Sequence, residues 1–404
     1  MKKTIIISIV LVLVLITAFL TYFKFISVKP LSNQTAPITD SIFPTINSIK
    51  ESVGNILGLG DEKISLAPAD IKTIESGSIR EINRLPSPGF IVNSEATSTL
   101  IYFNLENGLI ESLETFGRGL VANPIYKSPL TDVYNLTGNV NNSIATLLVE
   151  SSDLTGNQNK KIIRANLKDD LAIKQQTIKT ASSIVVGEEG EFYTIEELGL
   201  KSVVYVYTNP LFSRQKVVNL PINDWALQVV NKGLLAVTTL PDAETRGYLY
   251  LINLLDKNVD TGFTPQTNLQ TKISPDGLNI LYSTGNKTEN NLFVSDKENK
   301  TIVPTAVNTF AEKCVWSSNS KIVYCAVPKM ELKGSHLQDW HRGDISFNDK
   351  FVAVDSTTGL AKELIDPEIL GTKIDAMNLV YIESLGAVVF TNKTDLHTYL
   401  LEIN

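Results

Sequence analysis

Residues 273–282 read ISPDGLNILY, and they carry the strongest structural signal in the chain. Pro275 presets the backbone at the second position of a tight turn, and Gly277 accepts a positive φ. The segment therefore predicts a turn that leads into a short apolar strand. Residues 316–325 (WSSNSKIVYC) align with it without a gap, 43 positions later. A period of this size is typical of the four-stranded blade of a β-propeller.

A turn of small polar residues followed by a short apolar strand recurs along the chain. Further copies occupy residues 85–92, 140–148, 186–193, 230–237 and 382–390. Each copy is followed by another β-rich unit, usually with its own turn, such as Asn107-Gly108 or Thr358-Gly359. Two hairpins per repeat give four antiparallel strands. The sequence therefore predicts an all-β fold, a seven-bladed β-propeller of four-stranded antiparallel blades.

The last repeat ends one strand short, at residues 398–404. Residues 71–75 (IKTIE) precede the first copy and have no partner of their own. We therefore predict that this N-terminal strand completes the last blade, because an open ring would leave unpaired strand edges. The apolar segments 234–237, 280–282, 323–325 and 387–390 are predicted to be the innermost strands, and their apolar character argues against a catalytic channel.

The N-terminus predicts a membrane anchor. Residues 4–28 hold a single charge, Lys24, and about 20 apolar residues are enough to cross a bilayer as a helix. Lys2 and Lys3 precede the segment and favour a cytoplasmic N-terminus. A cleaved signal peptide is the alternative, but the apolar run ends in bulky residues rather than a small-x-small cleavage site. Both readings place the body of the protein outside the cytoplasm, and the first predicts a single-pass protein of the cell membrane.

Three segments follow from these patterns. Residues 1–29 are predicted to form one transmembrane helix. Residues 30–70, which are punctuated by prolines, are predicted to be a linker with a possible short amphipathic helix at 42–59. Residues 71–404 are predicted to form the propeller.

Charge narrows the range of partners. The chain has 404 residues and a net charge of −7. Outside the first 30 residues, 32 basic residues stand against 43 acidic ones, which is a net charge of −11. Phosphate backbones require an excess of Lys and Arg, so nucleic acid is not an expected partner.

The two clearest repeats resemble those of TolB-like propellers, a WD-repeat-like family. The resemblance rests on residues 274–277 (SPDG) and 316–321 (WSSNSK), which are close to a Trp-Ser-Pro-Asp-Gly-Lys pattern. Similar repeats form the propellers of prolyl-oligopeptidase-type enzymes. The resemblance implies a rigid extracytoplasmic scaffold that binds partners on its end faces. The copies at 186–192 and 382–388 depart from it, because they keep the turn but lose Ser-Pro-Asp.

Cys314 and Cys325 are the only cysteines, and they flank the turn of one hairpin. If Trp316 faces Lys321, the cysteines lie one diagonal step apart on the same face. A disulfide then requires a small change of register, and an oxidising compartment would favour it. Two buried free thiols are the alternative.

The sixth repeat carries an insertion, residues 328–344, which is rich in chemically active side chains. His336, Asp339, Trp340, His341 and Arg342 mark it as a candidate partner-binding loop, because exposed Trp and Arg are typical of binding hot spots. His and Asp at this spacing could also bind a divalent metal, but the spacing matches no strong ligand pattern. In a third interpretation, Trp340 packs against the blade and the charged side chains of the insertion remain in water.

No catalytic motif is recognisable, since the chain has neither a nucleophile elbow nor a phosphate-binding loop. His397 falls in the predicted last strand and is expected to be structural. We therefore predict no catalytic residue, no metal and no cofactor, and we expect a non-enzymatic scaffold for a protein or envelope ligand. The alternative is a propeller-type hydrolase or lyase acting on envelope glycans or peptides.

Overall fold

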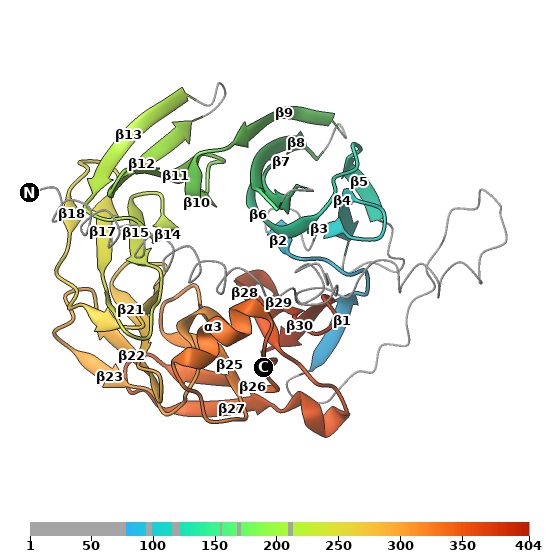
Figure 1. The fold of residues 1–404 in the computed structure, drawn as a ribbon. Coiled ribbons are helices and arrows are strands. Elements are labelled where there is room, and N and C mark those ends of the chain that lie inside the picture. Colours follow the sequence, from blue (N-terminus) through green and yellow to red (C-terminus); the bar gives the residue numbers. More distant parts are fainter. Residues whose placement is uncertain are drawn as a thin grey trace, which may run out of the picture. The chain divides into compact units, whose positions relative to one another are not determined.

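The computed structural model describes residues 78–93, 99–114, 122–153, 156–167, 171–208 and 213–403. Seven four-stranded antiparallel sheets follow one another around a ring in this part of the chain (Figure 1). The predicted seven-bladed propeller is therefore confirmed. The predicted anchor (1–29), linker (30–70) and strand (71–75) lie outside the described residues. Within the described residues, no helix is both long and apolar enough to span a bilayer.

In every blade the first strand named below is innermost and the last is outermost (Figure 1). The first blade consists of β2 (Phe90–Asn93), β3 (Thr99–Asn104), β4 (Leu109–Glu114) and β5 (Ala122–Tyr126). The second consists of β6 (Val133–Asn141), β7 (Ile144–Ser152), β8 (Gln158–Asn166) and β9 (Leu171–Ile178), and the third of β10 (Ala181–Val186), β11 (Phe192–Leu198), β12 (Lys201–Thr208) and β13 (Ser213–Leu220). The fourth consists of β14 (Trp225–Asn231), β15 (Leu234–Thr239), β17 (Leu249–Asn253) and β18 (Val259–Asp260).

The fifth blade consists of β20 (Gln270–Ile273), β21 (Asn279–Gly285), β22 (Asn290–Asp296) and β23 (Ile302–Pro304). The sixth consists of β24 (Cys314–Trp316), β25 (Ile322–Pro328), β26 (Asp349–Asp355) and β27 (Ala361–Ile365). The seventh consists of β28 (Ala376–Ile382), β29 (Ala387–Asn392), β30 (Thr398–Glu402) and β1 (Ile79–Asn83). The elements outside the blades are the two-stranded sheet of β16 (Arg246–Gly247) and β19 (Gln266–Thr267), the helix α3 (Ser335–Arg342), and the 3-10 helices η2 (Ala311–Lys313), η3 (Pro367–Leu370) and η4 (Glu383–Leu385).

The turn motif folds as the sequence predicts. Gly277 has φ +73°, a conformation that costs residues with a Cβ. The Ser274 hydroxyl donates to the Asp276 carboxylate (2.6 Å), which accepts from the Leu278 amide (3.0 Å). In the next repeat the Trp316 indole donates to the Lys272 carbonyl (3.0 Å). The recurring motif thus closes each turn and also joins it to the neighbouring blade.

The ring is closed by an N-terminal strand, as predicted, but this strand is β1 rather than residues 71–75. β1 pairs antiparallel with β30, with Ile79 opposite Leu401, and forms the outer edge of the seventh blade. The Ser78 hydroxyl also donates to the Glu402 carboxylate (2.7 Å). One expected hairpin is wrong in consequence. Residues 85–92 contain no hairpin, because β1 and β2 belong to different sheets and the chain crosses between blades there.

The predicted innermost strands are also corrected. Residues 234–237, 280–282, 323–325 and 387–390 lie in β15, β21, β25 and β29, the second strand of each blade. The innermost strands are the preceding ones, such as β20 and β24. A second strand is paired on both edges and covered on both faces, so it is more apolar than the strand that lines the axis. Ile280 and Val323, for example, are 0% exposed.

Apolar side chains from facing sheets fill the spaces between neighbouring blades. The space between the last and the first blade is filled in the same way as the others, because Ile82 and Leu400 pack with Phe90 and Leu100. A separate cluster beneath α3 contains Trp340 with four other buried side chains, Phe310, Leu332, Leu337 and Phe347.

Candidate functional site at the mouth of the ring

The sixth-blade insertion folds back onto the ring instead of projecting from it. It lies between β25 and β26 and carries α3, which sits inside the outline of the ring (Figure 1). The Gly334 amide donates to the Asn286 carbonyl (2.9 Å), and the Gln338 amide side chain donates to the Pro241 carbonyl (3.3 Å). The Lys393 ammonium donates to the Trp340 carbonyl. The insertion therefore links the fourth, fifth, sixth and seventh blades on the face where the innermost strands begin.

Trp340 does not lie on the surface, so the interpretation in which it packs against the blade is confirmed and the exposed anchor for a partner is wrong. Its side chain is 4% exposed and stacks on Phe347 (5.9 Å between ring centroids). Its indole donates to both oxygens of Asp375 (3.0 Å each). The ring is buried because it closes the cluster beneath α3.

The other predicted residues of the insertion make contacts within it or with the ring. Arg342 pairs with Asp339 and with Asp344 (2.8 Å to the latter). The His336 ring nitrogen Nδ1 accepts from the Lys333 amide (3.2 Å). These residues hold the helix and its ends together. Of His336, Asp339, His341 and Arg342, His341 alone has a side-chain contact outside the insertion in the described part of the chain.

A fully buried ion-pair cluster lies beneath α3. The Lys313 ammonium contacts Asp349 Oδ2 (2.9 Å), Asp375 Oδ1 (2.8 Å) and the Ala376 carbonyl (2.8 Å), and all three charged side chains are 0% exposed. The ammonium also lies 4.4 Å from the centroid of the Trp340 ring. The cluster links η2, β26 and β28, so it joins the sixth and seventh blades.

The two carboxylates of this cluster differ in their surroundings. Asp375 also accepts from the Ser346 hydroxyl (3.0 Å) and the Phe347 amide (2.9 Å). Asp349 Oδ1 has no hydrogen-bond partner. Burial raises the pKa of Asp349 to about 6, although Lys313 opposes the shift. Burial alone would lower the pKa of Lys313, but the two carboxylates raise it, so the ammonium stays charged.

The accessible chemistry lies next to this cluster, around Glu312 in η2. Glu312 Oε1 lies 2.7 Å from His341 Nε2, and Glu312 Oε2 accepts from the Gln270 side chain (3.2 Å). The side chains of His341 and Glu312 are 48% and 34% exposed. Burial alone would lower the pKa of His341, but the hydrogen bond to Glu312 raises it. Glu312 therefore favours the protonated, charged form of the His341 imidazole.

Two lysines interact electrostatically with the same carboxylate. Lys272 lies on the innermost strand β20, and burial lowers its pKa although Glu312 opposes the shift. Burial also lowers the pKa of Lys393, whose ammonium lies 4.4 Å from the centroid of the Trp340 ring. Lys272, Lys393 and His341 thus all interact electrostatically with Glu312. We call these three residues with Glu312 and Gln270 the mouth cluster.

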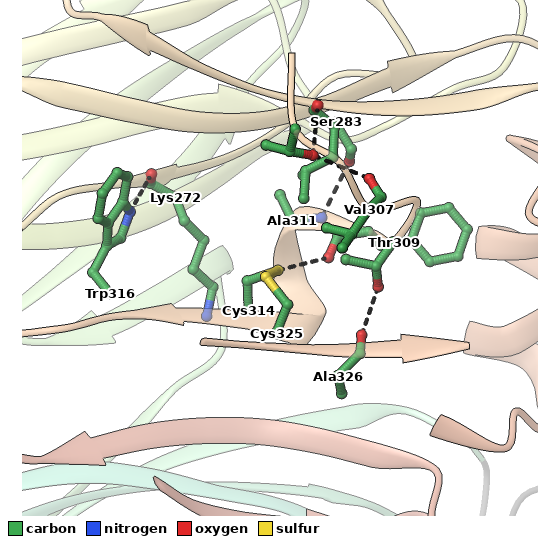
Figure 2. Close-up of a disulfide and its surroundings, with 12 residues drawn as sticks. Lys272, Ser283, Val307, Thr309, Ala311, Cys314, Trp316, Cys325 and Ala326 are labelled. Carbon is green, nitrogen blue, oxygen red and sulfur yellow. Dashed lines mark hydrogen bonds between the residues drawn. A yellow bond between two sulfur atoms is a disulfide. The ribbon is translucent and has the colours of Figure 1, made fainter. Parts of the chain in front are cut away.

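The two cysteines form a disulfide that adjoins the mouth cluster (Figure 2). Cys314 and Cys325 face each other directly on β24 and β25, with 4.1 Å between their Cα atoms. Trp316 faces Val323 and not Lys321, so the register differs from the expected one and no diagonal step is needed. Figure 2 shows the Lys272 amine pointing toward β24, the strand that carries Cys314. Because Cys314 directly follows η2, the disulfide helps to fix Glu312.

Sequence reasoning missed most of the mouth cluster. It selected His341, but Gln270 and Lys272 come from the fifth repeat, Lys393 from the seventh and Glu312 from the distant start of the sixth, and their convergence depends on the ring. One signal was available, since Glu312-Lys313 interrupts the otherwise apolar start of the sixth repeat, residues 310–316 (FAEKCVW). Among the described residues, no group of three or more His, Cys, Asp or Glu side chains could hold a metal ion.

Comparisons with known proteins identify the fold. No protein-family model matches the chain, and no curated protein matches its sequence, so the TolB-like resemblance is not confirmed. An oligogalacturonate lyase from Vibrio parahaemolyticus superimposes with a TM-score of 0.55 and 9% identity over 83% of this chain and 97% of the lyase. An oligogalacturonate lyase in complex with manganese gives 0.57 and 10% over 83% and 96%. The Cps50 (Swd1) propeller domain of Myceliophteria thermophila gives 0.52 and 10% over 83% and 100%.

These likenesses show that the chain has the fold of a seven-bladed, WD40-like β-propeller. They also correct the expectation that the protein is not an enzyme, because two of the structures that share the fold over most of this chain are lyases. The expectation of a protein that is not an enzyme rested on two arguments: the absence of local catalytic motifs, and the apolar segments predicted to line the channel. Those segments lie in the second strand of each blade and not in the innermost one.

Proposed function

We propose that the protein is a propeller-type lyase that acts on an acidic glycan of the cell envelope. In this proposal residues 4–28 anchor the chain in the membrane, and the propeller lies on the extracytoplasmic side. The observation that carries the proposal is the mouth cluster, in which three basic groups interact with one carboxylate. Two of its side chains, those of His341 and Glu312, reach solvent, at 48% and 34% exposed.

Charge supports an anionic substrate. The body of the protein is strongly acidic, whereas in the mouth cluster Lys393 and His341 outnumber Glu312 even when Lys272 is a neutral amine. The neighbouring cation Lys313 is paired with two carboxylates, Asp349 and Asp375, and so adds nothing to the local excess. A cationic site in an acidic protein concentrates anionic ligands and repels other ones.

The same groups suit β-elimination from a uronic acid. Burial lowers the pKa of Lys272, which favours the neutral amine that a general base requires. The amine takes the proton from C5, next to the sugar carboxylate. Lys393 balances the charge of that carboxylate, because two carboxylates, Asp375 and Glu312, favour its ammonium form whereas Glu312 alone favours that of Lys272. The electron pair forms the C4–C5 double bond as the C4–O bond breaks. The leaving oxygen takes its proton from the His341 imidazolium, which Glu312 keeps charged. No step requires a metal.

The lyase likenesses support this reading over a hydrolase, because they extend over nearly the whole length of those enzymes. The extracytoplasmic location is supported by the disulfide, since disulfides persist in oxidising compartments. The membrane anchor is supported by the apolar sequence of residues 4–28.

The test is turnover of acidic glycans by the purified full-length chain in detergent. Oligogalacturonates and other uronic-acid oligomers are supplied, and the ultraviolet absorbance of the unsaturated product is followed. We expect turnover by the natural protein with a bell-shaped pH dependence, and a loss of at least 100-fold in Lys272→Met and His341→Gln. Lys232→Met, an exposed lysine far from the mouth cluster, serves as the control and should keep full activity.

Three results would count against the proposal. Absence of an unsaturated product from every acidic oligomer would exclude a lyase that acts on uronic acids. Binding without product would leave the protein as a propeller that only binds an acidic glycan. Equal activity in Lys272→Met and the natural protein would remove the assigned base.

A further inference from the structure

A second unusual charge lies in the interface between the second and third blades. Arg164 is on β8, and its residue is 8% exposed. Its cross-strand partner on β7 is Thr146, whose hydroxyl donates to the Gly190 carbonyl of the third blade (3.5 Å). Cross-strand partners point to the same face of a sheet. The Arg164 side chain therefore points toward the third blade.

The Arg164 guanidinium has no partner in the described part of the chain. Its Nε is buried without a hydrogen-bond acceptor, and no ion pair reaches the group. Burial lowers the pKa of Arg164, and no carboxylate opposes that shift. A guanidinium cannot discharge itself, so leaving the buried Nε–H donor of Arg164 without an acceptor is costly.

Two other cations of this interface, Lys160 and Arg214, each have a carboxylate of their own. Lys160 lies 3.5 Å from Glu150 in the second blade. Arg214, which pairs with Tyr207 across β12 and β13, lies 2.6 Å from Glu196. Both acids are therefore committed, and the charge of Arg164 is left over. Positive charge exceeds negative charge here although the body of the protein is acidic.

We propose that Arg164 binds an oxyanion of a small ligand, a carboxylate, phosphate or sulfate group, between the second and third blades. The planar guanidinium fork matches such groups with two parallel hydrogen bonds. Aromatic rings of the third blade line the same interface, because Phe192 stacks on Tyr207 at 4.6 Å between centroids. The site lies on the third strand of its blade, away from the innermost strands, so it is distinct from the mouth cluster.

The test is thermal unfolding of the full-length chain with added anion at constant ionic strength. Sodium phosphate, sodium sulfate and sodium galacturonate are compared with sodium chloride. We expect a saturable rise of Tm with at least one of the three, and binding at least tenfold weaker in Arg164→Met. Arg164→Lys keeps the charge but loses the fork, so intermediate affinity is expected. Arg246→Met removes one exposed arginine elsewhere and should respond as the natural protein does.

The comparison among anions identifies the kind of ligand that carries the oxyanion. A response to galacturonate alone indicates an acidic sugar. A response to phosphate or sulfate indicates an inorganic or esterified anion. A Tm that depends on none of the three would overturn the proposal. So would an equal response in Arg164→Met, or a large loss of stability of that variant in chloride, which would show an internal partner for the guanidinium. Turnover of uronic-acid oligomers should be unchanged in Arg164→Met, so this test is independent of the lyase proposal.

Discussion

Replacement of Lys313 by methionine should reveal how strongly the buried ion-pair cluster holds the sixth and seventh blades together. The ammonium makes three contacts of 2.8–2.9 Å, to Asp349, Asp375 and the Ala376 carbonyl, and none of the charged groups reaches solvent. Methionine has a similar length but leaves two buried carboxylates without their cation. Breaking a buried pair from one side costs about 3–5 kcal/mol. We expect Lys313→Met to lose about 4 kcal/mol of unfolding free energy at pH 8.

The loss should depend on pH with a predictable sign. Burial raises the pKa of Asp349 to about 6, so this carboxyl becomes protonated when the pH falls below that value. In Lys313→Met its pKa rises further, since the opposing ammonium is gone. A neutral Asp349 no longer needs a cation, so the variant should recover part of its stability at pH 5. Because the folded-state pKa is raised above the ordinary value, the protonated form favours the fold, and this contribution is lost as the pH rises through the folded-state pKa.

The assay is equilibrium urea unfolding followed by tryptophan fluorescence at pH 5 and pH 8. Lys232→Met, which removes an exposed ammonium paired with Glu189, should change the unfolding free energy by less than about 0.5 kcal/mol. Adding Asp349→Asn to Lys313→Met should restore part of the loss at pH 8. A loss below about 1 kcal/mol at pH 8, or an equal loss at both pH values, would refute the buried-charge reasoning.

Three further perturbations test other parts of the account. The double variant Cys314→Ala/Cys325→Ala should lose about 2–3 kcal/mol in urea unfolding, since the disulfide closes a short loop of the chain, and an unchanged midpoint would contradict this. Trp340→Ala should cost about 3–5 kcal/mol, because it removes a buried ring, and a cost near zero would mean that the ring is exposed in solution. Glu81→Gln should lose about 1 kcal/mol near pH 5.5 by weakening the contact with His397 that joins β1 to the seventh blade, and nuclear magnetic resonance titration of His397 should show its pKa fall.

The pH window for that last contact follows from the two shifts. Burial alone would raise the pKa of Glu81, but hydrogen bonds from His397 and Arg84 lower it. The ionised Glu81 therefore stabilises the fold above about pH 4.5, and this stabilisation is lost in more acidic solution. Burial alone would lower the pKa of His397, but Glu81 raises it, so that contribution is full below about 6.5 and lost as the pH rises through the folded-state pKa. The contact therefore contributes most between these limits.

The architecture could be predicted from the sequence because each turn motif is local. Residues 274–277 specify their turn through their own side chains, and the repeat distance then gives the blade. The sequence could predict that an N-terminal strand closes the ring, because the last repeat lacked a strand. It could not predict which residues form that strand, since residues 71–75 and 79–83 have similar composition and the pairing of 79–83 with β30 is seen only in the structure.

The candidate site could not be predicted, because it is assembled from distant repeats. Glu312 meets Gln270 and His341 only after the fifth and sixth blades pack and α3 folds back over them. The sequence left open whether Trp340 packs against the blade or lies on the surface, because its neighbours in sequence are polar. On a helix, however, those neighbours point elsewhere, and one face of α3 is buried while the other carries the charges.

The most direct measurement of the central claim is a crystal structure of the His341→Gln variant with a bound uronic-acid oligomer. The account predicts that the sugar lies at the mouth cluster, with one sugar carboxylate within hydrogen-bond distance of the Lys393 ammonium and C5 facing the Lys272 amine. An oligomer bound elsewhere on the ring, with the space beside Glu312 and Lys272 free of sugar, would contradict the assignment of this site.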